Sequence, residues 1–418
     1  MQLLPGFREF PPAECARRNY ILSRWREVAR RYGFVEFDGP MLEPIELYQK
    51  KSGGELVGQL FDFVDKGKRH VALRPEMTPT LARMVATRHR DYRKPMKWFC
   101  VPPFFRYEKQ QRGRLREFWQ LNCDLFGDNS PGADAEMLAV VIDMLRVFGF
   151  GPQDFVVRLS DRDAWARFAA KRGLTVEKVP DLLAVVDKME RATPAENAER
   201  LAPFGLSLEE VREFIANPGD ETQKLDGIRA DLRARGLEEY VAVDLTIVRG
   251  LAYYSGLVFE VFDRAKNERA LAGGGRYDQL ISVMSEGKVD LPALGFGMGD
   301  VVLGNFIDDH PAAAEKMKQW IAAQHAADVF VIIAKEERRP DALALVQTLR
   351  EAGQRVDYEL GAAKVGKQFQ TAEHLGARFA VVIGDEWPQV KVKTLATREE
   401  RVVGVAEVAG VLAQTMRQ

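Results

Sequence analysis

The sequence predicts an α+β protein in which a β-rich region is interrupted by a block of helices and followed by a smaller α/β domain. Three observations support this prediction. Residues 119–125 alternate between polar and apolar side chains, as a half-buried strand does. Residues 161–236 have helical periodicity with breaks at prolines, which indicates an inserted subdomain. From about residue 326, strand patterns alternate with helix patterns, which is typical of a small parallel or mixed sheet.

Shorter patterns predict the individual elements. Residues 14–36 predict an amphipathic helix that closes at Gly33 and leads into a strand. Strand patterns recur at 155–161 and 240–250, on either side of the helical block. In the last part of the chain we expect strands at 328–334, 355–360, 379–385 and 390–395, and helices at 340–353, 369–377 and 404–416.

Length and composition describe an ordinary globular protein with two or three domains. The chain has 418 residues, 46% of them hydrophobic and 29% charged, and a net charge of −1. This balance argues against a histone-like or architectural nucleic-acid protein, but an enzyme that acts on nucleic acid needs only local cationic patches. We expect no membrane span and no secretory signal. Cys15, Cys100 and Cys123 lack zinc spacing and suit reduced thiols, so we expect a cytoplasmic protein without a metal site.

The segment FRYEKQQRGRLREFWQLNCD, residues 105–124, carries the strongest chemical signal. Five cations surround one loop glycine, Gly113: Arg106, Lys109, Arg112, Arg114 and Arg116. The following strand places Gln120, Asn122 and Asp124 on one face and apolar side chains on the other. A cationic hairpin above a polar floor suits a phosphate-bearing substrate, because guanidinium groups bind phosphate oxygens in pairs. The alternative is a solvated hairpin with scattered charges.

Three further segments have both a functional and a structural interpretation. In LRPEMT, Glu76 follows a proline and could bind an α-ammonium group, or it could be an acidic residue at a helix start. In VRGLAYYSGLVFE, residues 248–260, two adjacent tyrosines follow Arg249 and Gly250. The structural interpretation is a core strand, but Gly250 would weaken such a strand, which favours a functional role. In AGGGRYD, residues 272–278, the glycines either let backbone approach a ligand or form a turn.

Together these segments resemble the class II aminoacyl-tRNA synthetases, and the histidyl-tRNA synthetase family in particular. Residues 105–124 are similar to motif 2, and residues 37–49 resemble motif 1, which builds a dimer interface. Residues 73–78 resemble the family's LRPE.T segment. Residues 248–260 and 272–278 resemble the two histidine signatures of the family, in the expected order.

The resemblance implies a domain organisation for the whole chain. Residues 1–160 and 237–322 would form the class II catalytic domain, an antiparallel sheet flanked by helices. Residues 161–236 would form a helical insertion, and residues 323–418 an α/β anticodon-binding domain. It also implies a homodimer.

The resemblance further implies ligation of L-histidine to tRNA(His) through a histidyl-adenylate, with ATP as substrate and Mg²⁺ bound with the ATP. Arg106 and Arg249 would be catalytic. The residues that would bind histidine are Glu76, Thr78, Gln120, Asp124, Tyr253, Tyr254 and Tyr277. Those that would bind ATP are Arg106, Glu108, Arg114 and Arg249.

The chain departs from the family at class II motif 3. That motif normally ends in Gly–x–Glu–Arg, with the arginine on or near ATP. The residues after Gly299 are Asp300, Val301 and Val302, so this arginine is missing. Either another cation serves the nucleotide, or this branch manages without one, or adenylation has been lost. Our choice for a compensating cation is Arg114 of the motif 2 loop.

Three other positions differ from the family pattern. Asp124 stands where the family usually has glutamate, and Ala252 replaces an aspartate of the first signature. The motif 2 loop has Lys109, Gln110 and Gln111 where the family usually has Arg–Pro–Gln, which puts recognition of an extra 5′ guanosine in question.

Two rival interpretations remain. A catalytically inactive, synthetase-like regulatory subunit of ATP phosphoribosyltransferase would explain the missing arginine, but those subunits generally lack the terminal domain. A phosphate-loop enzyme would rest on GAAKVGK, residues 361–367, which has the required glycine and lysine spacing. Gln368 stands where that motif needs Ser or Thr.

Overall fold

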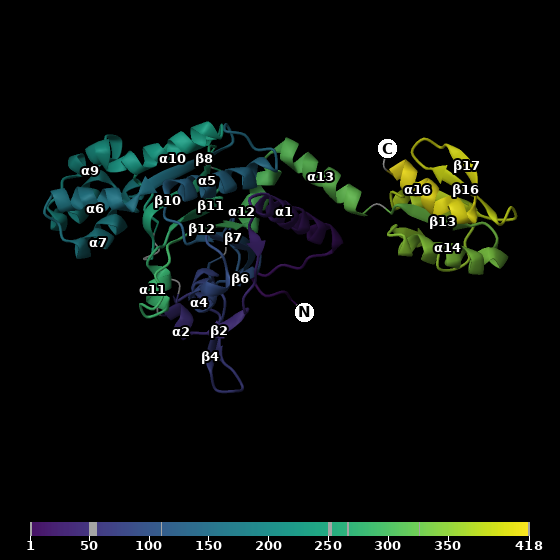
Figure 1. The fold of residues 1–418 in the computed structure, drawn as a ribbon, viewed down its shortest axis with the longest axis horizontal. Helices are drawn as coiled ribbons and strands as arrows, with labels where there is room; N and C mark the ends of the chain where they lie inside the picture. Colours follow the sequence, from purple (N-terminus) through teal and green to yellow (C-terminus); the bar gives the residue numbers. More distant parts are fainter. Residues whose placement is uncertain are drawn as a thin grey trace. The chain divides into compact units, whose positions relative to one another are not determined.

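A computed structural model of the chain describes residues 2–49, 57–109, 111–249, 253–265, 267–325 and 327–416. It contains two compact units, Met1–Lys316 and Met317–Gln418 (Figure 1). The second unit begins within helix α13, Pro311–His325, which also contains the predicted domain boundary. The finer division of the first unit into a catalytic domain and an insertion stays a prediction.

A nine-stranded sheet forms the centre of the first unit. Its strand order is β1-β5-β7-β12-β11-β10-β8-β9, with β6 paired to β7. The strands are β1 Val35–Glu36, β5 Met96–Cys100, β6 Pro103–Phe105, β7 Glu117–Phe126, β8 Phe155–Asp161, β9 Val241–Val243, β10 Ser255–Asp263, β11 Ala272–Arg276 and β12 Ala293–Gly299. Neighbours run antiparallel from β5 to β8, and the two end pairs, β1 with β5 and β8 with β9, are parallel. The predicted α+β fold with a largely antiparallel sheet is confirmed.

Helices cover this sheet because their apolar faces are buried against it. Helix α5, Pro131–Arg146, starts where the Ser130 side chain accepts a hydrogen bond from the amide of Ala133. It packs against α1, Pro12–Arg31, which also contacts α12, Asp300–Asp308 (Figure 1). Helix α4, Thr78–Arg88, contacts the short α11, Leu280–Met284.

A second, small sheet is formed by strands between residues 42 and 73. It has the order β2-β4-β3, with strands β2 Leu42–Pro44, β3 Asp62–Val64 and β4 His70–Leu73, all antiparallel. The short helix α2, Glu46–Gln49, follows β2. In this sheet β2 and β3 are edge strands.

The predicted helical block is observed. Its α-helices are α6 Arg162–Lys171, α7 Val179–Val186, α8 Pro194–Leu201, α9 Leu208–Ala216 and α10 Gln223–Ala234. Capping boxes start α8 and α9. The rings of Phe168 and Phe214 stack at 4.2 Å inside the block, whereas α10 packs on α5 of the central layer.

The strand expected at 240–250 is shorter than its pattern suggested. Strand β9 ends at Val243 because the next residue, Asp244, forms a local turn. Its carboxylate accepts hydrogen bonds from the backbone and side chain of Thr246, at 3.0 and 2.6 Å.

The second unit is an α/β domain with a mixed sheet, as predicted. Its strand order is β14-β13-β15-β16-β17, with β13 Val329–Ile333, β14 Val356–Tyr358, β15 Phe379–Ile383, β16 Gln389–Thr394 and β17 Glu400–Gly404. The helices are α14 Arg339–Glu351, α15 Val365–His374 and α16 Val408–Met416. Strand β13 is apolar throughout because Val331 packs with residues of α14 and α16 while Ile332 packs with residues of α15.

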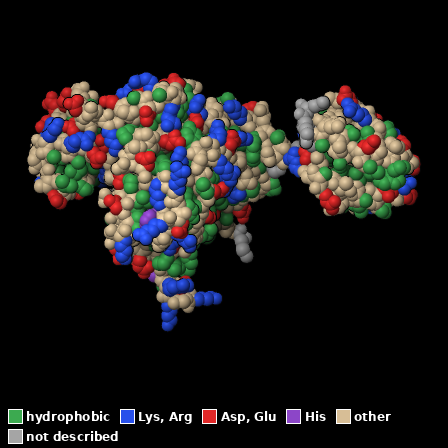
Figure 2. All heavy atoms as spheres, in the orientation of Figure 1, with side chains coloured by type: hydrophobic (Ala, Val, Ile, Leu, Met, Phe, Trp, Pro, Cys, Tyr) green, Lys and Arg blue, Asp and Glu red, His purple; other side chains and the backbone are tan. Residues whose placement is uncertain are grey.

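The surface of the protein mixes charges of both signs. On the face shown in Figure 2, Lys and Arg side chains are interspersed with Asp and Glu, in agreement with the net charge of −1. No helix within the described ranges is long and apolar enough to cross a bilayer.

Candidate active site

Two adjoining cavities open above the central sheet of the first unit. The smaller has a volume of about 270 Å³ and the larger about 850 Å³. Every residue expected to bind histidine lines the smaller cavity: Glu76, Thr78, Gln120, Asp124, Tyr253, Tyr254 and Tyr277. Every residue expected to bind ATP lines the larger: Arg106, Glu108, Arg114 and Arg249. Arg106 and Arg249 border both cavities, so they lie at the junction. The roles of these residues stay predictions.

Strand β7 supplies the floor of the smaller cavity. Gln120, Asn122 and Asp124 all line it, as their alternation indicated, and the Gln120 amide donates to the Asn122 side chain at 3.0 Å. Gly295 of the neighbouring β12 pairs with Asp124. A Cβ on Gly295 would lie 2.0 Å from Asp124 Oδ1, so only glycine leaves room for this carboxylate.

The Asp124 carboxylate has one oxygen that is hydrogen-bonded and one that has no partner among the described residues. Its Oδ1 accepts a hydrogen bond of 2.5 Å from the Tyr277 hydroxyl. Its Oδ2 is buried and has no hydrogen-bond partner among the described residues. Burial raises the pKa of Asp124 to about 7, although the Tyr277 bond opposes that rise. The site therefore presents a buried acceptor that a ligand N–H could satisfy.

Glu76 and three tyrosines, Tyr253, Tyr254 and Tyr277, also line the smaller cavity. Glu76 precedes α4, whose N-cap is Met77, so it lies outside the first helical turn. The Tyr253 hydroxyl donates to Glu76 at 3.3 Å. The ring of Tyr253 lies 5.0 Å from that of Tyr254 and 6.0 Å from that of Tyr277. Burial raises the pKa of all three hydroxyls, which remain neutral donors at physiological pH.

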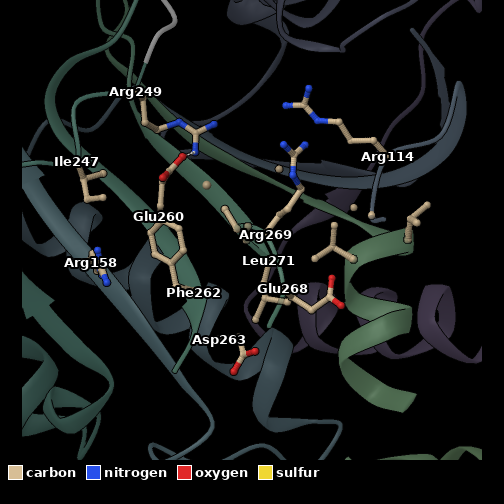
Figure 3. Close-up of a pocket in the computed structure, with 18 of the residues that line it drawn as sticks. Arg114, Arg158, Ile247, Arg249, Glu260, Phe262, Asp263, Glu268, Arg269 and Leu271 are labelled. Atoms are coloured by element: carbon tan, nitrogen blue, oxygen red, sulfur yellow. Dashed lines mark hydrogen bonds and ion pairs between the residues drawn. The ribbon is translucent and has the colours of Figure 1, made fainter. Parts of the chain in front are cut away.

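Arg249 reaches the cavity junction from an unusual backbone conformation. Its φ is +50°, a left-handed value that non-glycine residues rarely adopt and that is often found at functional sites. Its guanidinium pairs with Glu260 of β10 at 2.8 Å (Figure 3). Gly273 of β11 pairs with Glu260, and a Cβ there would lie 1.5 Å from Arg249 Nη1. The glycine signature thus makes space for the arginine of the other signature.

The motif 2 hairpin uses its cations in different ways. Arg106 donates to the Pro75 carbonyl at 2.8 Å, and Arg114 pairs with Glu108 at 3.0 Å. Arg112 instead pairs with Glu268 and Asp309, at 2.6 and 2.8 Å. Arg116 makes a cation–π contact, with its guanidinium carbon 4.0 Å from the centre of the Tyr107 ring.

The residues in place of the motif 3 arginine have structural roles. Asp300, the first residue of α12, is buried, pairs with Arg8 at 2.8 Å and accepts from the amide of Trp119 at 2.9 Å. Val301 and Val302 line the larger cavity. The position of the missing arginine is therefore an apolar wall.

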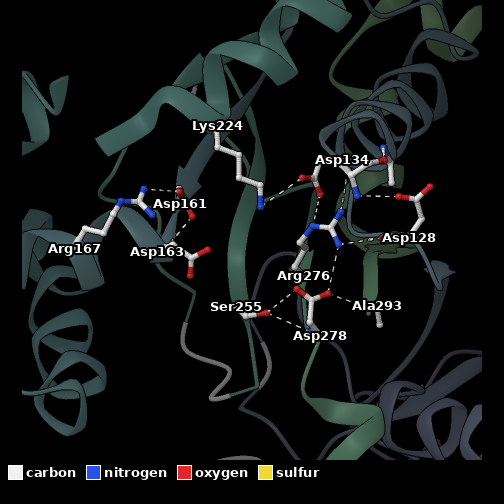
Figure 4. Close-up of polar contacts among 12 residues, drawn as sticks. Asp128, Asp134, Asp161, Asp163, Arg167, Lys224, Ser255, Arg276, Asp278 and Ala293 are labelled. Carbon is white, nitrogen blue, oxygen red and sulfur yellow. Dashed lines mark hydrogen bonds and ion pairs between the residues drawn. The ribbon is translucent and has the colours of Figure 1, made fainter. Parts of the chain in front are cut away.

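Behind Tyr277, a buried ion network ties the site to the helical block (Figure 4). Arg276 pairs with Asp134 of α5 at 2.6 Å and with Asp278 at 3.4 Å. Lys224 of α10 reaches the same Asp134 at 3.8 Å. Both Arg276 and Asp134 are nearly inaccessible to solvent. This network therefore fixes the position of the last residue of β11, which directly precedes Tyr277.

Sequence reasoning missed several charged residues of the larger cavity. Asp187 and Arg191 come from the helical block, and Arg158 and Arg269 come from β8 and the β10–β11 connection. None stands in a motif, so no local pattern could have identified them. Glu260 had a signal, because it closes the first histidine signature.

Three sequence observations have limited or negative outcomes. Gln110 and residues 250–252, including Ala252, lie outside the described residues. In GAAKVGK, the following Gln368 is buried and bonds both the amide and the carbonyl of Ile333 at 2.8 Å. That side chain holds α15 against β13 and leaves no hydroxyl for a phosphate-loop metal. Within the described part of the chain, no group of three or more His, Cys, Asp or Glu could hold a metal ion.

Fold and cavities together have the form of a class II aminoacyl-tRNA synthetase core. Residues 6–299 match the family described as Histidyl-tRNA synthetase, and residues 328–415 match the Anticodon binding domain. The Histidine--tRNA ligase of Opitutus terrae is 43% identical over 427 aligned positions, which cover 96% of this chain and 95% of that protein. The chain belongs to the histidyl-tRNA synthetase family.

Solved structures agree in fold. The crystal structure of histidyl-tRNA synthetase from Nostoc superposes with a TM-score of 0.74 at 23% identity and covers 99% of both chains. A structure from Bacillus halodurans, described as an ATP phosphoribosyltransferase regulatory subunit/histidyl-tRNA synthetase, gives a TM-score of 0.69 at 22% identity and covers 89% of this chain and 96% of its own.

Proposed function

We propose that this chain ligates L-histidine to tRNA(His) in two steps, through a histidyl-adenylate, with ATP as the second substrate. The observation that carries the proposal is the buried, unpaired Oδ2 of Asp124 in the wall of a small cavity that adjoins a larger, arginine-rich one. The names of relatives such as the Opitutus terrae enzyme support the same activity.

In the first step, histidine occupies the smaller cavity. Glu76 and Gln120 hold its α-ammonium group, and Thr78 and Tyr253 complete that wall. Asp124 and Tyr254 read the imidazole, with Tyr277 orienting the Asp124 carboxylate. Paired polar contacts to the ring nitrogens discriminate against apolar analogues far better than shape alone.

ATP occupies the larger cavity with its α-phosphate at the junction. The histidine carboxylate attacks the α-phosphorus and pyrophosphate leaves. Negative charge builds on phosphate oxygens in this transition state, so Arg106 and Arg249 are proposed to stabilise it from two sides. Arg114 and Glu108 are proposed to contact the nucleotide. Mg²⁺ enters as part of the substrate, held by the phosphates of ATP.

In the second step, the terminal ribose of tRNA(His) takes the histidyl group and AMP leaves. The second unit is proposed to bind the anticodon, in keeping with its match to the Anticodon binding domain. The enzyme is proposed to act as a homodimer in the cytoplasm, where the free thiols of Cys15, Cys100 and Cys123 would stay reduced.

The alternative is a regulatory subunit without catalytic activity. The missing motif 3 arginine and the similarity to the Bacillus halodurans structure favour it, whereas the terminal domain favours the ligase. Charging of a tRNA(His) transcript with radiolabelled histidine tests the proposal, with a tRNA of another specificity as control. We expect acid-precipitable label on tRNA(His) alone; absence of label on both would support the regulatory subunit.

A further inference from the structure

The apolar wall at Val301 and Val302 leaves the larger cavity without the cation that motif 3 normally provides. Most other arginines of this cavity already have carboxylate partners. Arg114 pairs with Glu108 at 3.0 Å, and Arg249 pairs with Glu260 at 2.8 Å. A triphosphate that entered here would need positive charge that is not already neutralised.

Arg269 offers such a charge. It lies on the connection between β10 and β11, and its side chain projects into the cavity between Arg114 and Arg249 (Figure 3). No carboxylate of the described residues lies within 4.0 Å of its guanidinium, the distance limit for an ion pair. Its charge is therefore available to a ligand.

The stem of Arg269 also adjoins the position of the missing arginine. The point that a Cβ on Gly113 would occupy lies 3.9 Å from Arg269 Cδ and 3.1 Å from Val302 Cγ2. In the family pattern Gly–x–Glu–Arg, Val302 stands at the position of the arginine. Arg269 can thus extend its guanidinium into the space that an arginine at 302 would use.

The local field supports an anionic ligand. Burial lowers the pKa of Arg269, and the positive charge of the neighbouring Arg114 lowers it further, although the carboxylate of Glu108 opposes this fall in part. Two guanidinium groups that repel one another are stabilised when an anion binds between them. Distal phosphates of a nucleotide are anions of the required charge and size.

We propose that Arg269 supplies the cation that the first turn of α12 lacks, and that it binds the β- and γ-phosphates of ATP. It replaces Arg114, our choice from the sequence, whose guanidinium is already paired with Glu108. The inference rests on the proposed function, since it names a residue of the same adenylation site. As pyrophosphate forms, Arg269 holds the departing group while Arg106 and Arg249 hold the α-phosphate.

A second unpaired arginine, Arg191, is a weaker candidate. It belongs to the 3-10 helix Met189–Arg191 of the helical block. Its charge acts on Glu260, the partner of Arg249. The atoms nearest to the point that a Cβ on Gly113 would occupy, beside Val302, include Arg269 Cδ and none of Arg191.

The test compares Arg269→Ala with Arg264→Ala in histidine-dependent ATP–pyrophosphate exchange. Arg264 follows the end of β10 but donates to the Pro152 carbonyl at 2.6 Å, outside the cavity. We expect Arg269→Ala to raise the KM for ATP about 10- to 100-fold, the range for a lost hydrogen bond between charged groups. The KM for histidine, and its affinity measured by calorimetry, should stay unchanged, as should both constants in Arg264→Ala.

A rescue experiment separates this role from general damage. In the double variant Arg269→Ala/Val302→Arg, the cation returns at the family position, and the KM for ATP should recover by about tenfold or more. An unchanged or lower KM for ATP in active Arg269→Ala would overturn the inference and leave the proposed function intact. Equal loss of histidine affinity, or no rescue, would also overturn it. Absence of exchange in the unmutated enzyme would contradict both this inference and the proposed function.

Discussion

The Asp124 carboxylate is the single residue on which the proposed selectivity for histidine depends most. One oxygen is held by Tyr277, and the other is buried and has no hydrogen-bond partner among the described residues. The alternation of β7 predicted which side chains would face the pocket. It could not predict the unpaired oxygen, because that depends on Tyr277, which follows β11, and on Gly295 of β12. The shorter aspartate therefore keeps its place in the pocket through contacts that are distant in sequence.

The raised pKa of Asp124, about 7, gives a pH-dependent prediction. Ionised Asp124 accepts the imidazole N–H and the protonated form does not, so histidine affinity should fall as pH drops through 7. Free histidine also titrates, near pH 6.5, and Asp124→Asn retains that component. Between pH 8 and pH 6, calorimetry should give about a tenfold larger loss in the unmutated protein than in Asp124→Asn.

A second variant checks the same residue. Tyr277→Phe removes the hydrogen bond that opposes the rise in the pKa of Asp124. The midpoint of the histidine-binding profile should therefore move above pH 7. Identical profiles for the unmutated protein and Asp124→Asn would exclude Asp124 as the imidazole acceptor.

Arg249→Ala should lower the rate of pyrophosphate exchange about 100- to 1000-fold, the usual loss for one preorganised donor. Arg249 borders both cavities, so its charge lies where negative charge develops. Arg200→Ala, an exposed arginine of α8, is the control and should keep the full rate. Near-normal exchange in Arg249→Ala would show that the assignment is wrong.

At the level of secondary structure, most elements follow from local patterns, and the exceptions have local causes. The 155–161 strand and the helices of the insert agree with their periodicity. Strand β9 stops early at the Asp244 turn, and β17 was not expected because its pattern is partly charged. Glu400 of that edge strand pairs with Lys393 at 2.7 Å, a contact that only strand pairing creates.

The approach of β11 to Arg249 gives a prediction at this level. In Gly273→Ala the new methyl group would displace the Arg249 guanidinium, from which it would be 1.5 Å away. A displacement of this size at a catalytic group costs about 100-fold in rate. The thermal unfolding midpoint should change little, because the displaced atoms end a flexible side chain. Gly227→Ala in α10, where a Cβ meets no atom within 4 Å, should keep the rate; equal rates in both variants would contradict this account.

For the whole molecule, the motif residues line one cavity although they are spread from residue 76 to residue 277. The residues of the smaller cavity could be predicted from the sequence because each motif has a characteristic spacing. Some charged residues of the larger cavity could not be predicted, because Arg191 and Arg269 reach it from separate elements that carry no motif. The oligomeric state could not be predicted from local patterns either, and only the resemblance to motif 1 suggested a dimer.

The proposed dimer has a structural counterpart in exposed apolar side chains on two edge strands, β1 of the central sheet and β3 of the small sheet. Val35, Phe63 and Val64 are 64%, 48% and 65% exposed, and burying them in a symmetric interface would be favourable. Light scattering at micromolar concentration should give a dimer for the unmutated protein and a monomer for Phe63→Asp. Leu360→Asp, at an 82% exposed site of the second unit, should remain dimeric. A fully active monomer of the unmutated protein would refute the proposal.

Histidine-dependent ATP–pyrophosphate exchange by the unmutated protein tests the central claim most directly. It requires both cavities to be filled and the α-phosphate to react between them, without any contribution from tRNA. The account predicts exchange that depends on L-histidine, is absent with other amino acids, and continues although the motif 3 arginine is missing. Binding of histidine without any exchange would contradict it and would indicate a regulatory protein.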